Sequence, residues 1–225
     1  MFRLCLCVCL CVCSLPQIAS AQVAKFRLEV TDLSGSPIDT VTVGDQFLLN
    51  SYAQQVGGFD GDPADAGVFA GYLDINYDGS LVSIASDEIA HGPLYSNGPS
   101  GDLSTSGFID NIGGFSSSDD PLDILPVPPG PDEQMLFSVS FQADAAGELS
   151  FVGSDSLSHP VHEVLVWTSL EPVPASDIDF GAEELRIDFG SLNLSIQPVP
   201  EPHAACLLSV GLFGLAARLR KRRSV

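Results

Sequence analysis

A short acidic loop is the first place where the residue types could do chemistry. The segment GGFDGDPADAG places Asp60, Asp62 and Asp65 among glycine, alanine and proline residues, which favour a loop. Calcium takes about six to eight oxygen ligands from flexible loops, and backbone carbonyls could supplement these carboxylates. We therefore name Asp60, Asp62 and Asp65 as candidate calcium ligands. The alternative is a solvated acidic loop that holds no metal.

A second acidic motif, DINYDG, looks like the start of a calcium-binding loop. Asp74, Asn76 and Asp78 have the spacing D-x-N-x-D-G, but such a loop needs an acidic ligand at its twelfth position, where this chain has Ala85. The flanking residues alternate as strands do, so the motif predicts a strand followed by a turn. The segment SSSDDPLD, with its three aspartates, is a weaker metal candidate in a looser loop.

Catalytic signatures are weak throughout the chain. His159, His162 and Glu163 lie in HPVHE, where Pro160 and the predicted strand after it exclude the helical pair of histidines that zinc hydrolases use. No G-x-S-x-G sequence is present. Trp167 could be a platform for a sugar ring, although a single Trp in an alternating strand more often packs in a core. We expect a protein that is not an enzyme.

The elements that position these residues are predicted to be strands. Apolar residues alternate with polar ones, so Phe26, Leu28 and Val30 should point inward, as should Met135, Phe137, Val139 and Phe141. The alternation occurs twice near the end of the chain and slips at Gly190, which predicts a bulge or a bend. Further strands are predicted over residues 40–43, 46–53, 67–77, 81–86, 107–112, 148–152 and 161–168.

Short, half-buried strands at this spacing predict an all-β fold, an antiparallel jelly-roll β-sandwich over residues 22–197. No segment between the two ends of the chain has a convincing helical stripe. The polar stretch from Ser96 to Glu133 is too long for a tight turn, and we expect it to contain one strand and a long loop.

The N-terminus has the pattern of a secretory signal peptide. Arg3 precedes an apolar run, and the small residues of Ala19-Ser20-Ala21 form an A-x-A cleavage pattern. We expect signal peptidase to cut between Ala21 and Gln22. Five of the six cysteines lie in this leader and the sixth is Cys206, so the exported domain has none for disulfides.

Charge restricts the partners of the exported domain. Between residues 22 and 201 the basic residues are Lys25, Arg27 and Arg186, against all 29 acidic residues, which gives a net charge of −26. This excludes nucleic acid, because phosphate binding needs lysine and arginine. Calcium, a cationic partner or a neutral polysaccharide stays compatible with it.

The C-terminus reverses this charge. Pro200, Glu201 and Pro202 precede an uncharged run from Ala204 to Ala217, which as a helix would span about 21 Å, less than the roughly 30 Å of a bilayer core. We expect a short transmembrane helix over about residues 203–219. The basic residues at its end and after it should stay on the cytoplasmic side; they are Arg218, Arg220, Lys221, Arg222 and Arg223.

The order of these three parts resembles the PEP-CTERM sorting signal of Gram-negative bacteria, over residues 198–225. The resemblance implies that an exosortase recognises and removes the segment. The inner-membrane anchor would then be transient, and the protein would reach the cell surface, outer envelope or extracellular matrix. It also implies an exopolysaccharide or biofilm setting.

A second resemblance covers the predicted sandwich. The segments VTVGD at Val41–Asp45, YDGSLV at Tyr77–Val82 and LFSVSFQADAAG at Leu136–Gly147 are similar to the cohesin family. Cohesins are jelly-roll sandwiches that bind partner proteins, so the resemblance implies a binding or adhesion module. The other interpretation is a polysaccharide-binding module that serves an extracellular polysaccharide system. The ligand would be an unknown protein or an unknown polysaccharide.

Overall fold

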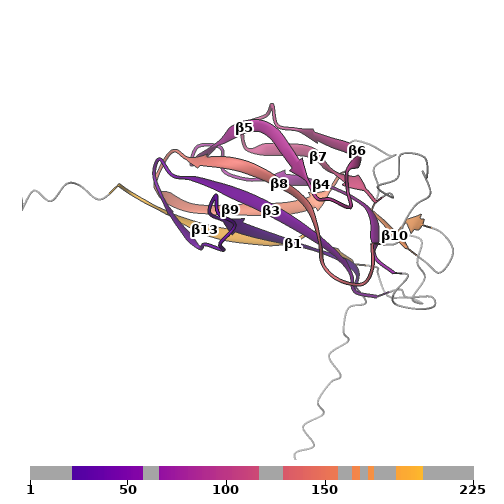
Figure 1. Ribbon diagram of the computed structural model, residues 1–225. Helices are drawn as coiled ribbons and strands as arrows, with labels where there is room; N and C mark the ends of the chain where they lie inside the picture. Colours follow the sequence, from indigo (N-terminus) through magenta and orange to yellow (C-terminus); the bar gives the residue numbers. More distant parts are fainter. Residues whose placement is uncertain are drawn as a thin grey trace, which may run out of the picture.

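The computed structural model describes residues 22–57, 66–116, 129–156, 164–167, 172–174 and 186–199. Within these ranges, two sheets pack face to face as a β-sandwich, as predicted (Figure 1). The strands are β1 Gln22–Thr31, β2 Thr40–Thr42, β3 Gln46–Gln55, β4 Val68–Asn76, β5 Val82–His91, β6 Asn97–Asp102, β7 Phe108–Phe115, β8 Gln134–Ala143, β9 Gly147–Asp155, β10 Leu165–Trp167, β11 Pro172–Pro174, β12 Arg186–Asp188 and β13 Ser191–Gln197.

The first sheet has the order β12-β1-β3-β8-β5, and the second has β11-β10-β4-β9-β13-β2, with β7 beside β4 and β6 beside β7. Most neighbouring strands are antiparallel. Two pairs, β1 with β12 and β13 with β2, are parallel. These parallel pairs lie where a late strand of the chain joins an early one, so they close the sandwich around its core.

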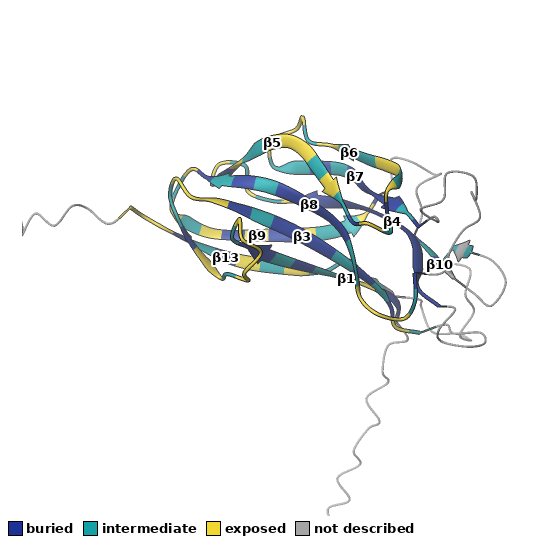
Figure 2. Ribbon diagram, viewed as in Figure 1, coloured by how far each residue is buried: buried dark blue, intermediate teal, exposed yellow. Residues whose placement is uncertain are grey.

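Alternating side chains fill the space between the sheets. In β1, Phe26, Leu28 and Val30 are buried while Lys25 is exposed, which confirms the predicted inward face (Figure 2). The centre of the core is aromatic: the ring centroids of Phe141 and Phe151 are 5.1 Å apart, and Tyr77 meets Phe141 edge-on at the same distance. Edge-to-face contacts of this kind stabilise a core beyond the area that they bury.

The predicted inward face of β8 is wrong at one residue. A register shift opposite Ser51 and Tyr52 leaves Leu136 as an extra residue in β8. Leu136 is fully buried in the core, whereas Met135, which we expected to point inward, is only partly buried and pairs with Tyr52. A bulge of this kind interrupts the two-residue period, and alternation alone gives no sign of it.

The slip predicted at Gly190 is confirmed as a bend between the sheets. Gly190 has a φ of +75° and separates β12, in the first sheet, from β13, in the second. A side chain there would also collide, since its Cβ would lie 2.6 Å from the Phe26 carbonyl oxygen. Glycine therefore allows the chain to cross the side of the sandwich close to β1.

The start of β1 and the end of β13 lie at opposite ends of the sandwich (Figure 1). The signal peptide through Ala21 and the predicted helix over 203–219 lie outside the described residues. In the part of the chain that the structure describes, no helix is long and apolar enough to cross a membrane.

Candidate binding groove

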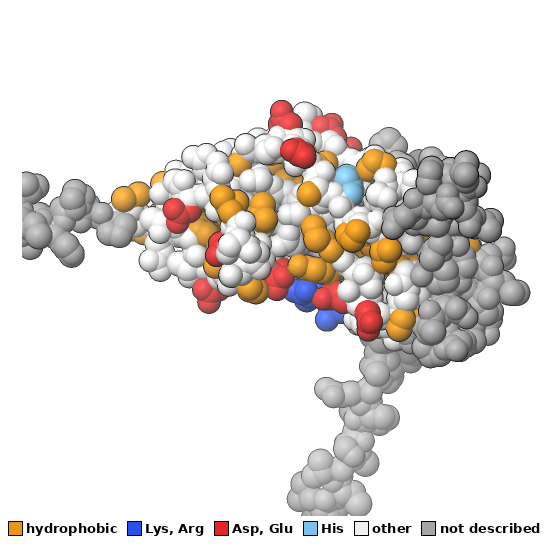
Figure 3. All heavy atoms as spheres, viewed as in Figure 1, with side chains coloured by type: hydrophobic (Ala, Val, Ile, Leu, Met, Phe, Trp, Pro, Cys, Tyr) orange, Lys and Arg blue, Asp and Glu red, His pale blue; other side chains and the backbone are white. Residues whose placement is uncertain are grey.

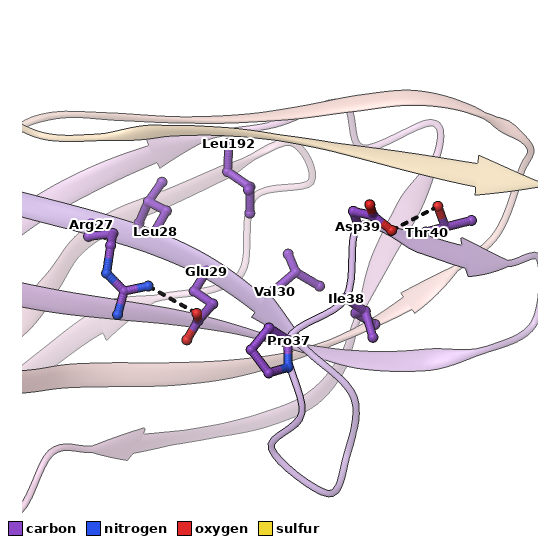
Figure 4. Close-up of a pocket in the computed structure, with 9 residues that line it drawn as sticks. All are labelled: Arg27, Leu28, Glu29, Val30, Pro37, Ile38, Asp39, Thr40 and Leu192. Atoms are coloured by element: carbon purple, nitrogen blue, oxygen red, sulfur yellow. Dashed lines mark hydrogen bonds and ion pairs between the residues drawn. The ribbon is translucent and has the colours of Figure 1, made fainter.

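A groove of about 530 Å³ opens on the side of the sandwich, between β1 of one sheet and β13 of the other (Figure 4). Its lining residues come from β1, from the segment that leads into β2, from the first residue of β2, and from β13; they are Arg27, Leu28, Glu29, Val30, Pro37, Ile38, Asp39, Thr40 and Leu192. We define these nine residues as the edge groove.

Two crossings of the chain close the ends of the edge groove. At one end the Ile38 N–H donates to the Val30 carbonyl oxygen at 2.9 Å, and the Ser195 N–H donates to the Asp39 carbonyl oxygen at 3.1 Å. The segment containing Ile38 and Asp39 therefore bonds to both sheets. At the other end the bend at Gly190 passes close to Phe26. Between these crossings no strand of the described ranges covers the side of the sandwich.

The floor of the edge groove is apolar. Leu28 and Val30 belong to the hydrophobic core, and Ile38 and Leu192 are half-buried against it. Leu192 and Leu28 face one another across the opening between the sheets (Figure 4). An apolar group that binds between them would be transferred from water to a hydrophobic surface, and this transfer is favourable.

Arg27 organises one rim of the groove. Its guanidinium lies 3.0 Å from the Glu29 carboxylate and donates two hydrogen bonds to Glu133. The same group lies 4.3 Å above the ring centroid of Tyr52. The hydrogen bond from Arg27 lowers the pKa of Glu133, and the bond to Glu133 raises that of Arg27. Both side chains therefore stay charged at neutral pH.

Asp39 and Thr40 form the opposite rim, where the Thr40 hydroxyl donates to the Asp39 carboxylate at 3.2 Å. Asp39 is exposed and is paired with no cation among the described residues. The groove lining thus contains the acidic groups Glu29 and Asp39 and the basic group Arg27. Glu133 lies beside this lining, where Arg27 bonds to it and the charge of Lys25 also acts on it. Figure 3 shows lysine and arginine side chains gathered at one place, with acidic side chains beside them and along the periphery.

The DINYDG motif is a strand and a turn, as the alternation predicted. Asp74 is buried in β4, where its carboxylate accepts a hydrogen bond from the Asn111 N–H at 2.8 Å, and burial raises its pKa. Asp78 instead closes the turn after β4, since its carboxylate accepts bonds from the Ser80 hydroxyl and N–H. Within the described ranges, no three His, Cys, Asp or Glu side chains gather closely enough to hold a metal ion.

The remaining predicted sites lie outside the described residues. They are Ala21, the candidate calcium ligands Asp60, Asp62 and Asp65, the acidic segment at Asp119, Asp120 and Asp123, the HPVHE residues His159, His162 and Glu163, the sorting residues Pro200, Glu201 and Pro202, and the basic residues Arg218, Arg220, Lys221, Arg222 and Arg223. Gln22 is the first described residue and begins β1. Trp167 ends β10, and its side chain is not described.

Sequence reasoning missed the edge groove. Leu28 and Leu192 have the alternating pattern of ordinary core residues, and nothing in that pattern shows that a gap lies between their strands. The only local signal is the pair Pro37-Ile38, an apolar pair after the turn Ser34-Gly35-Ser36. Its pairing with the end of β1 could not be predicted without the register.

Comparison with known families identifies the C-terminus. Residues 198–223 match the PEP-CTERM protein-sorting motif, which confirms the assignment made from the sequence. A motif of this kind indicates an exported protein that is sorted to the cell surface. No curated protein matches the sequence.

The solved structures similar to the chain include cohesin modules. One is from a family 33 glycoside hydrolase of Clostridium perfringens, with 14% identity, a TM-score of 0.45, and coverage of 80% of this chain and 100% of that one. Another is a type II cohesin domain from the cellulosome of Acetivibrio cellulolyticus, with 11% identity, a TM-score of 0.47, and coverage of 76% and 95%. A third belongs to a type I cohesin–dockerin complex of Clostridium thermocellum, with 11% identity, a TM-score of 0.43, and coverage of 78% and 99%.

Proposed function

We propose that this chain is an exported, non-enzymatic binding module of the cell surface or extracellular matrix. Signal peptidase would release it after Ala21, and its C-terminal segment would hold it in the inner membrane of a Gram-negative-type bacterium. An exosortase would then recognise Pro200, Glu201 and Pro202 and remove the segment. The folded β-sandwich is the part of the protein that this processing would deliver to the cell surface.

The main support for this proposal is that the β-sandwich ends where the sorting motif begins. The last described strand, β13, ends at Gln197, and the Gln197 carbonyl oxygen accepts a hydrogen bond from the Val43 N–H at 2.9 Å. The sorting motif begins at the next residue, 198. The motif therefore contributes no described strand to the sandwich, and its removal leaves the two sheets and their core intact.

Three of the described aspartates have a structural role in turns and not the properties of a general acid, whereas Asp74, whose pKa burial raises, is buried in β4 and accepts a hydrogen bond from the Asn111 N–H. Asp32, Asp78 and Asp102 each accept hydrogen bonds from a serine two residues later, and these bonds lower their pKa values. Carboxylates in such turns are fully ionised hydrogen-bond acceptors that fix the backbone. A general acid needs the opposite, a pKa raised toward neutrality.

Processing by exosortase is tested in the native host. Replacing Pro200, Glu201 and Pro202 by alanine should leave the full-length chain in the membrane fraction, while the wild-type protein appears at the surface or in the medium. Asp144→Ala, an exposed acidic residue in a turn of the sandwich, is the matched control and should be processed normally. Normal processing of the triple variant would contradict the proposal.

One surface favours a second candidate function, the binding of a neutral polysaccharide. The outer face of β3 and β8 has no Asp, Glu, Lys or Arg of its own although the domain is strongly anionic, and the Arg27 guanidinium of β1 lies over Tyr52 at its border. Its residues that are not buried are Gln46, Leu48, Tyr52, Gln54, Met135, Ser140 and Gln142. Amides and hydroxyls can bond to sugar hydroxyls without desolvating a charge. Retention of the protein on insoluble neutral polysaccharide, lost in Gln142→Glu and kept in Asp144→Ala, would support this function.

A further inference from the structure

We propose that the edge groove binds an extended, basic segment of a partner protein, which adds a short strand to the open edge of β1. The inference rests on the proposed function as a binding module, and it specifies the site and the chemistry of the partner.

The first observation is that β1 has an uncovered stretch. β12 pairs with β1 over Gln22 and Lys25, and the Pro37-Ile38 segment pairs with Val30 and Thr31. Among the described residues, the stretch from Arg27 to Glu29 between these two covers has a partner strand only on the β3 side. Strand edges left open in this way are sites for pairing with another chain.

The second observation concerns the backbone groups at this edge. The N–H and C=O groups of successive residues in a strand point to opposite sides. The Val23 carbonyl accepts from Val56 on the β3 side, whereas the Val30 carbonyl accepts from Ile38 on the other side. Leu28 is two residues before Val30, so its N–H and C=O point to the same side of β1 as those of Val30, which is the side of the groove. Among the described residues none bonds to either group.

These backbone groups select a polypeptide as the ligand. An extended chain offers a donor and an acceptor at the strand period, which matches the N–H and C=O of Leu28. The side chain of the bound peptide that points into the groove would then lie over the apolar floor, beside Ile38 and Leu192. Its neighbouring side chains, which alternate with this one, would point toward the charged rim at Glu29.

Charge decides which polypeptide fits. Glu29 and Asp39 line the groove, and Glu133 lies beside it, where Arg27 and Lys25 offset its charge. Arg27 is also paired with Glu29, so Asp39 is the acidic lining residue that no cation pairs with among the described residues. The domain around it has a net charge of −26 between residues 22 and 201. A second copy of this chain would bring the same charge to the edge and be repelled. A segment in which lysine or arginine alternates with apolar residues complements both the rim and the floor.

The backbone part is tested by amide hydrogen exchange on the protein purified from its host. In the free protein the Leu28 N–H should exchange at least about tenfold faster than those of Arg27 and Glu29, which face β3. A short peptide of alternating lysine and valine should then slow Leu28 exchange about tenfold. Strong protection of Leu28 without the peptide, or protection that rises with protein concentration alone, would overturn the inference.

Paired variants test the groove and its charge. Thr40→Trp fills the groove and should abolish peptide binding, whereas Thr105→Trp, at an exposed turn elsewhere, should not. Asp39→Lys should weaken binding several-fold, and Asp144→Lys should have little effect. A peptide with glutamate in place of lysine should not bind. Equal binding of the two peptides, or unchanged binding to Thr40→Trp, would overturn this inference. Because processing is measured separately, that result would leave the proposed function standing.

Discussion

The Arg27 guanidinium donates two hydrogen bonds to the Glu133 carboxylate, at 2.8 and 2.7 Å, across 106 residues of sequence. This pair joins the middle of β1 to the segment that enters β8. Because the same guanidinium also contacts Glu29 and the Tyr52 ring, one arginine fixes the rim of the edge groove.

Removing this pair should have a small effect that depends on salt. Glu133→Gln keeps the shape but loses the charge, so the free energy of unfolding should fall by about 0.5–1 kcal/mol, as for partly exposed ion pairs. Asp132→Asn is the matched control. Urea unfolding at low and high salt measures the difference, which should shrink as salt rises. Equal destabilisation by the two variants would contradict the role given to Glu133.

Acid should weaken the turns that aspartates close. The Ser80 hydroxyl and N–H hold the pKa of Asp78 below its usual value. Since the pKa is lower in the folded state, the stabilisation is complete above the unfolded pKa and is lost as the pH falls through the folded one. Carboxyl titration by NMR should show that Ser80→Ala raises the pKa of Asp78, while Ser83→Ala leaves it unchanged. A pKa insensitive to Ser80→Ala would contradict this account of the turn.

The buried hydroxyl of Tyr95 should contribute to stability through one bond. Tyr95 is fully buried, its hydroxyl donates to the Val68 carbonyl oxygen at 2.7 Å, and burial raises its pKa. Tyr95→Phe leaves that acceptor without its donor, so the free energy of unfolding should fall by about 1–2 kcal/mol. Tyr52→Phe should cost less, because the Tyr52 side chain is partly exposed and water can bond to its neighbours after the hydroxyl is removed. Thermal or urea unfolding of both variants decides between these expectations.

Much of the fold could be predicted because most strands alternate. The alternation predicted the inward face of β1, which consists of Phe26, Leu28 and Val30. The interruption of the alternation at Gly190 predicted the bend that the structure shows between the sheets. Alternation failed where other contacts decide the structure. β6, Asn97–Asp102, has the sequence NGPSGD without an apolar period, and it forms by pairing with β7. A proline is tolerated there because the strand lies at an edge. The groove was not predictable, because it depends on which stretch of β1 the other strands leave uncovered.

Calcium binding at Asp60, Asp62 and Asp65 stays a prediction. A cation that binds only the folded state raises the melting temperature, and at about one hundred times its Kd it adds about 2.7 kcal/mol. Calcium should therefore raise the melting temperature of the wild type but not that of Asp60→Asn. Asp119→Asn, in the other acidic loop, should respond as the wild type does. No shift in the wild type would exclude this loop as a calcium site.

The intact mass of the protein from its native host, with and without a functional exosortase, tests the central claim most directly. We predict a surface or extracellular species that begins at Gln22 and lacks the arginine-rich end, and a membrane-bound species that keeps Val225 when exosortase is absent. A mature protein that retains Val225 in cells with active exosortase would contradict the claim.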